Sequence, residues 1–150
     1  RRADAIKVAA TLLAYGRRGL GDMVDACHAL ARHAEKRVRF ENRLTLEAPA
    51  ELTTVVFRYR AINPPTESGA NRTEFENQVN AELRRTLLRS GRALIGRTTL
   101  SDDGQERICL KLTLINPNTT AEQVDALMNE IVETGKRCEI HMREAEGDCE

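Results

Sequence analysis

The sequence is short of aromatic residues, of lysine and of any excess charge. Its 150 residues contain no tryptophan, two tyrosines and three phenylalanines, which leaves few rings for stacking on the bases of a nucleic acid. The 23 basic and 23 acidic residues cancel, so no overall field draws the chain to nucleic acid or to an anionic membrane. Only four of the basic residues are lysines: Lys7, Lys36, Lys111 and Lys136.

Long apolar runs and cysteine motifs are also missing. The longest strongly apolar stretch, residues 8–15, is too short to span a bilayer, and Arg1 and Arg2 open a predicted helix instead of a signal peptide. The cysteines are Cys27, Cys109, Cys138 and Cys149. Because they are scattered and lack C-x-x-C spacing, they favour free thiols over disulfides or zinc ligands, and we expect a cytoplasmic protein.

No motif of known chemistry stands out among the polar residues. The histidines form no H-x-x-x-H pair, and no serine or cysteine occupies a nucleophile elbow, so neither a metal site nor a catalytic triad is indicated. The histidines are His28, His33 and His141. Residues 16–21 form neither a G-x-G-x-x-G fingerprint nor a Walker loop, and they follow a helix where a strand would be required. This run therefore predicts a turn between two helices.

Apolar residues recur at helical spacing in four segments. Two leading helices are expected over about residues 3–15 and 20–38, and a third over about residues 73–90. The last helix is predicted to begin at Thr119, where Glu122 completes a capping box, and to end before Gly135. The polar tail that follows would be an edge strand or a disordered end.

Alternation of apolar and polar residues predicts the strands. They are expected near residues 44–46, 53–60, 94–100 and 107–115, and the last two are joined by a turn over residues 101–104 that contains an Asp-Gly pair. Strands and helices together predict an α+β fold, in which an antiparallel sheet of about four strands carries helices packed on one face.

The same alternation sorts the strand side chains onto two faces. The face expected to meet the helices carries Val55, Phe57, Tyr59, Ile108, Leu110, Leu112 and Leu114. The opposite, open face carries Arg58, Arg60, Cys109, Lys111 and Thr113. Lys111 places a charge in an otherwise apolar strand, so it is either an anion-binding lysine or a solvated strand residue.

Five blocks of the sequence, in order, resemble the group II pyridoxal-phosphate-dependent decarboxylases, which include glutamate, diaminobutyrate and aromatic amino-acid decarboxylases. The blocks are RRADAIK (1–7), LAYGRRGLG (13–21), VVFRY (55–59), SGRAL (90–94) and LTLINPNTT (112–120). The resemblance covers about residues 1–135, and the bacterial diaminobutyrate branch is the most similar. It implies the C-terminal small domain of a fold-type I enzyme, whose large domain holds the cofactor.

By this resemblance, residues 1–40 would lead from the large domain, residues 41–135 would form the small domain, and residues 136–150 would be a polar tail. The family's Schiff-base lysine usually follows a histidine, and none of the four lysines has that context. The chain alone is therefore expected to bind no pyridoxal phosphate and to be inactive. Its implied partners are the missing large domain, an amino-acid substrate and a second subunit of a homodimer.

The resemblance also implies a role for Lys111. The family commonly has an arginine at the matching position, facing the substrate carboxylate, and lysine keeps the charge but loses the bidentate fork. Lys111 is thus the predicted substrate-binding residue of this chain. The alternative function is a non-catalytic dimerisation or ligand-binding module derived from the same fold.

Overall fold

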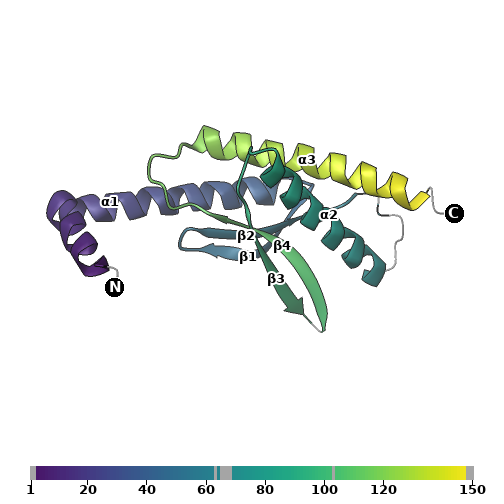
Figure 1. Cartoon of the computed structure of the whole chain (residues 1–150), viewed down its shortest axis with the longest axis horizontal. Coiled ribbons are helices and arrows are strands. Elements are labelled where there is room, and N and C mark those ends of the chain that lie inside the picture. The colour runs from purple at the N-terminus through teal and green to yellow at the C-terminus, as the bar shows by residue number, and fades with distance from the viewer. Residues whose placement is uncertain (1–2, 63, 65–68, 103, 148–150) are drawn as a thin grey trace.

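The computed structural model describes residues 3–62, 64, 69–102 and 104–147. In these residues, three helices accompany one four-stranded sheet (Figure 1). The elements are α1 (Asp4–Phe40), β1 (Leu44–Glu51), β2 (Thr54–Tyr59), α2 (Gly69–Arg89), β3 (Gly96–Asp102), β4 (Gln105–Thr113) and α3 (Ala121–Gly147). The sheet is antiparallel with the order β1-β2-β4-β3, which confirms the predicted fold class. Arg1, Arg2, Asp103 and Cys149 lie outside the described residues.

Helix α1 contains the two predicted helices, joined through a kink. Gly16 has a φ of 65° and a ψ of 177°, a conformation that glycine adopts readily and that interrupts the helix. The segment after the kink buries a stripe from Cys27 to Val38 against the sheet and α3. The segment before it leaves Ile6 and Leu13 exposed, at 70% and 89%. The first apolar stripe is therefore not part of the described core.

The predicted strand faces are confirmed for the residues that meet the helices. Val55, Phe57 and Tyr59 of β2 and Leu110 of β4 are fully buried, because alternate residues of a strand point to the same face. The hairpin prediction is confirmed as well. β3 pairs with β4 from Gly96–Lys111 to Asp102–Gln105, and Gly104 adopts a φ of 80° in the turn.

Helix α2 lies across the sheet and packs on β4 and α3 (Figure 1). Its predicted apolar stripe is confirmed, since Phe75, Val79, Leu83 and Leu87 are all buried. Gly91 follows the helix with a φ of 67°, as expected for a glycine at a helix end.

The predicted limits of the last helix are wrong at both ends. The capping box forms between Thr120 and Gln123, whose side chains bond each other's backbone N–H groups at 3.3 and 3.0 Å. The helix then passes through Gly135 and continues to Gly147. Residues 136–147 are therefore helical, not an edge strand or a disordered tail. Gly135 lies inside the helix, where its missing side chain makes room for the buried ring of Tyr59.

Candidate functional site: the open face of the sheet

The open face of the sheet is organised around β4. Arg107, Cys109, Lys111 and Thr113 alternate along this strand and share the face opposite the helix-packed residues. The strand pairing places Val56 of β2 on one side of Lys111 and Gly96 of β3 on the other. The predicted open-face residues are thus brought together, but their burial differs.

Lys111 and Thr113 are exposed, as the alternation predicted. Within the described part of the chain, Lys111 forms no ion pair and no side-chain hydrogen bond. Arg60 is also exposed, beyond the end of β2. Lys111 therefore offers a solvated positive charge on the uncovered side of the sheet.

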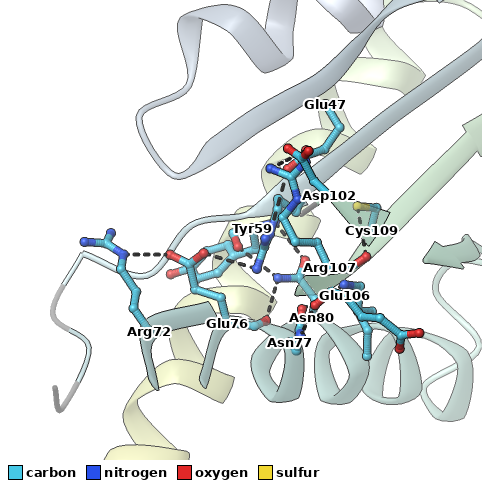
Figure 2. Close-up of polar contacts among 12 residues, drawn as sticks. Glu47, Tyr59, Arg72, Glu76, Asn77, Asn80, Asp102, Glu106, Arg107 and Cys109 are labelled. Carbon is cyan, nitrogen blue, oxygen red and sulfur yellow. Dashed lines mark hydrogen bonds and ion pairs between the residues drawn. The ribbon is translucent and has the colours of Figure 1, made fainter. Parts of the chain in front are cut away.

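Arg58 and Cys109 depart from the expectation of an open face, because both are buried. The Arg58 guanidinium lies 3.2 Å from the Glu76 carboxylate of α2 and 3.9 Å from that of Glu47 on β1. Glu47 also lies 3.5 Å from Arg107. Figure 2 shows Glu47, Glu76 and Arg107 within this network of charges. A buried guanidinium is stable only with such partners.

Two asparagines of α2 form hydrogen bonds to backbone groups of β2 and β4 where these two strands no longer pair with each other. β2 and β4 pair only between Thr54–Phe57 and Leu110–Thr113. Beyond that point, Asn80 accepts from the N–H of Tyr59 at 2.8 Å and donates to its carbonyl at 2.9 Å. Asn77 accepts from the N–H of Ile108 at 2.7 Å and donates to the carbonyl of Glu106 at 2.8 Å. Figure 2 shows both amides in this gap. They supply partners for backbone groups that lie beyond the last β2–β4 pair.

Sequence reasoning missed this charged and amide cluster, although one signal was present. Asn77 and Asn80 are three residues apart and therefore neighbours on one helix face. Asparagine is unfavourable inside a helix because its side chain competes for backbone groups. Two asparagines beside the buried Val79 could have indicated such a contact.

The Cys109 thiol is buried within the same cluster. Its burial raises the pKa of the thiol, and the nearby Glu47 carboxylate raises it further. A thiol needs a lowered pKa to supply thiolate at neutral pH. Cys27 and Cys138 are likewise buried free thiols, so we assign no chemistry to these cysteines.

A second polar cluster fixes the C-terminal half of α3 to β2. The Tyr59 hydroxyl donates to the Glu139 carboxylate at 2.7 Å and accepts from the Arg43 guanidinium at 2.8 Å. Burial raises the pKa of Tyr59 well above its usual range, and the hydrogen bond to Glu139 adds to this shift.

We expect Tyr59 to stay neutral in alkaline solution until the domain unfolds. Because its folded pKa exceeds the unfolded value of about 10, its stabilising contribution is complete below that pH and is lost as the pH rises above it. Tyr15→Phe leaves Tyr59 as the sole tyrosine. Tyrosinate absorbance should then appear together with the loss of the helical circular dichroism signal, and earlier ionisation would contradict the expectation.

The chain is similar in sequence to a segment of two curated amino-acid decarboxylases. The chain is 33% identical over 141 residues to the L-2,4-diaminobutyrate decarboxylase of Rhizobium meliloti, covering 94% of the chain and 26% of that protein. It is 28% identical over 131 residues to the aromatic-L-amino-acid decarboxylase of Bacillus atrophaeus, covering 87% of the chain and 25% of that protein. The chain therefore spans about a quarter of the length of these curated relatives.

A solved structure supports the same conclusion. The glutamate decarboxylase domain of diaminobutyrate-pyruvate transaminase and L-2,4-diaminobutyrate decarboxylase from Vibrio parahaemolyticus is 31% identical and has a TM-score of 0.71, covering 91% of the chain and 27% of that structure. No family model matches the chain. The resemblance to group II decarboxylases is confirmed by these homologues.

The lysines of this chain do not fit the anchor of pyridoxal phosphate. Lys7 and Lys136 pair with Asp4 and Glu133 on the exposed surfaces of their own helices, at 3.4 and 2.7 Å. The Lys36 amine lies 6.0 Å from the ring centre of Phe40 at the exposed end of α1. Lys111 lies exposed on the open face of the sheet. Within the described residues, no helix is long and apolar enough to cross a membrane.

Proposed function

We propose that this chain is the C-terminal small domain of a pyridoxal-phosphate-dependent L-amino-acid decarboxylase of the diaminobutyrate or glutamate type. In the intact enzyme its open sheet face would close beside the active site, and Lys111 would bind the α-carboxylate of the substrate. The observation that carries this proposal is Lys111, which is exposed on the open face of a decarboxylase-like fold and has no ion pair with any described residue.

The cofactor would be held by the rest of the enzyme. Pyridoxal phosphate supplies the electron sink for decarboxylation, and the lysines of this chain do not fit its anchor. The chain alone would therefore be inactive, and its contribution would be substrate orientation and closure of the site. A cytoplasmic homodimer is proposed for the intact enzyme on the resemblance alone.

The exposed apolar surface of α1 supports a missing large domain. Besides Ile6 and Leu13, the segment before the kink exposes Val8, Leu12 and Tyr15. An isolated helix of this length is marginal in water and is stabilised mainly by packing of its apolar face. Because the curated relatives are about four times longer than the segment they share with this chain, we propose that the remaining polypeptide covers this surface.

A pocket next to the sheet supplies a second apolar contact for the same partner. Its volume is about 260 Å³, and it is lined by Met23, Val24, Cys27, Thr53, Ile115 and Pro117. Val24 and Ile115 are exposed at 61% and 74%. Exposed apolar patches of this kind are typical of interaction sites.

The chemistry of Lys111 suits a carboxylate in a closed site. An ammonium group makes a charge-assisted hydrogen bond to a carboxylate, which is stronger than a neutral one. Unlike arginine, lysine presents a compact charge without a planar fork. It would therefore attract and orient the carboxylate with fewer geometric restraints than an arginine imposes.

Replacing Lys111 by alanine in the intact decarboxylase is expected to reduce kcat/KM without unfolding the protein. Loss of one charge-assisted hydrogen bond costs about 1.5 to 3 kcal/mol, or roughly ten- to over a hundredfold in kcat/KM. Lys111→Arg should retain more activity than Lys111→Ala. Steady-state kinetics on variants of matched melting temperature measure the effect.

Lys136→Ala is the matched control, because Lys136 lies on α3 and pairs with Glu133. It should leave kcat/KM unchanged. Wild-type kcat/KM in the Lys111→Ala enzyme would contradict the proposed role. Lys111 would then be interpreted as a solvated strand residue.

A further inference from the structure

Gly96 lies directly opposite Lys111 in the β3–β4 pair. A Cβ atom built on Gly96 would lie 3.2 Å from Cε of Lys111, 3.4 Å from its Cβ and 3.1 Å from its carbonyl oxygen. The close approach of Cε shows that the aliphatic stem of Lys111 leans across β3 at the position of this glycine. The space that a side chain at residue 96 would fill is thus used by Lys111.

The other neighbour of Lys111 is larger. Val56 of β2 pairs with Lys111 from the opposite side, and its side chain is branched at Cβ and therefore stiff. Directly paired residues on one face of a sheet have their side chains in contact range. Lys111 consequently has a bulky neighbour toward β2 and an open path toward β3.

The φ angle does not require glycine at residue 96. The glycines with positive φ in the described residues are Gly16, Gly91 and Gly104, and Gly96 is not among them. A glycine in a strand weakens the strand, and it often marks a place where another group approaches closely. Here the approaching groups belong to Lys111: its backbone carbonyl oxygen lies at 3.1 Å from the built Cβ, and Cε of its side chain lies at 3.2 Å.

We propose that Gly96 is a positioning residue that sets the direction of the Lys111 amine. With glycine on one side and valine on the other, the stem lies over β3 and carries the ammonium group toward that edge of the sheet. The consequence for substrate binding rests on the function proposed above. An alanine at residue 96 would require Lys111 to move, because its Cβ would approach the stem more closely than most real Cβ contacts allow.

The geometric part can be tested on this chain by NMR with labelled lysine. The chain has only four lysines, and loss of a signal in Lys111→Arg identifies that of Lys111. We expect a cross-peak between the Lys111 Hε protons and the Gly96 Hα protons, and displaced Lys111 side-chain signals in Gly96→Ala. Gly21→Ala is the control, since a Cβ there meets nothing within 4 Å. Unchanged Lys111 signals in Gly96→Ala would overturn the inference.

The functional part needs a double-mutant cycle in the intact decarboxylase. Gly96→Ala should lower kcat/KM by about tenfold, because small displacements of a binding group are costly. Lys111→Ala should lower it further, and adding Gly96→Ala to Lys111→Ala should cost nothing more if the glycine acts through the lysine. The variants are compared at matched melting temperatures.

The possible failures are distinguishable. Wild-type kinetics in Gly96→Ala, with Lys111→Ala impaired, would overturn the positioning role and leave the proposed function intact. An equal loss from Gly96→Ala with or without Lys111 would also overturn it, because the glycine would then act through the fold. Wild-type kinetics in Lys111→Ala would overturn the proposed function, and the NMR result alone would decide whether Gly96 orients the amine.

Discussion

Leu112→Asp is expected to unfold the domain, whereas Thr113→Asp is expected to be tolerated. Leu112 is buried and pairs with the fully buried Val55 on the face that meets the helices. Its replacement removes apolar packing worth about 2 to 5 kcal/mol and places an unpaired carboxylate in the interior. The total exceeds about 4 kcal/mol, which is a large part of the stability of a typical domain.

Thr113 is the matched control because it is adjacent in β4 but exposed on the open face. Aspartate at residue 113 should lower the free energy of unfolding by no more than about 1 kcal/mol, because its strand propensity is poor. Thermal and urea unfolding followed by circular dichroism measure both variants. Similar melting temperatures for the two would show that the assignment of the strand faces is wrong.

The parts of the fold that could be predicted from the sequence are those with a local cause. The two-residue period places Val55, Phe57 and Leu110 on one face without knowledge of the strand order. The three- and four-residue steps of α2 identify Phe75 and Val79 in the same way. The Asp-Gly pair specifies the hairpin because it satisfies the turn backbone locally.

The surroundings of Arg58 could not be predicted, because they depend on contacts between distant segments. Its carboxylate partners come from β1 and from α2, eleven residues before it and eighteen after it, as the numbering of Glu47 and Glu76 shows. Alternation gives the direction of the Arg58 side chain but does not reveal the charges that bury it. Because Arg58 and Cys109 are buried, the exposed part of the open face is smaller than predicted. It centres on Lys111 and Thr113.

Lys111 shows how far the candidate site could be predicted. Its face and its exposure follow from alternation in β4, and the structure confirms both. Its role in substrate binding depends on groups that lie outside this chain and stays a prediction. The direction of its side chain depends on which neighbour leaves room for it, and this contact appears only in the three-dimensional structure.

The predicted end of α3 is wrong because glycine has two different uses in helices. It often follows the last turn, where a positive φ is needed, and it also allows close contact with another group. Gly135 serves the second use, since a Cβ there would lie 2.3 and 2.4 Å from Cδ2 and Cε2 of Tyr59. The sequence near Gly135 does not distinguish these uses, because Tyr59 is far away in the chain.

Gly135→Ala is therefore expected to destabilise the domain, although alanine favours a helix over glycine by about 1 kcal/mol. Tyr59 cannot move aside easily, because its ring is fully buried and its hydroxyl is bonded to Glu139 and Arg43. Glu139 lies four residues after Gly135, on the same face of α3. Overpacking of such a site costs about 1 to 3 kcal/mol, occasionally more, and after the helix preference of alanine is subtracted we expect a net loss of up to about 2 kcal/mol.

Gly21→Ala supplies the matched control, because Gly21 is also inside a helix and a Cβ there meets nothing within 4 Å. This variant should be more stable than the wild type, by up to about 1 kcal/mol, so the two alanine substitutions should have opposite signs in urea unfolding. The double variant Tyr59→Leu/Gly135→Ala should lose less than the two single costs added together, since a smaller residue 59 leaves room for the new Cβ. If the free-energy costs of the two substitutions simply add, the Tyr59 ring is not the reason why residue 135 is glycine.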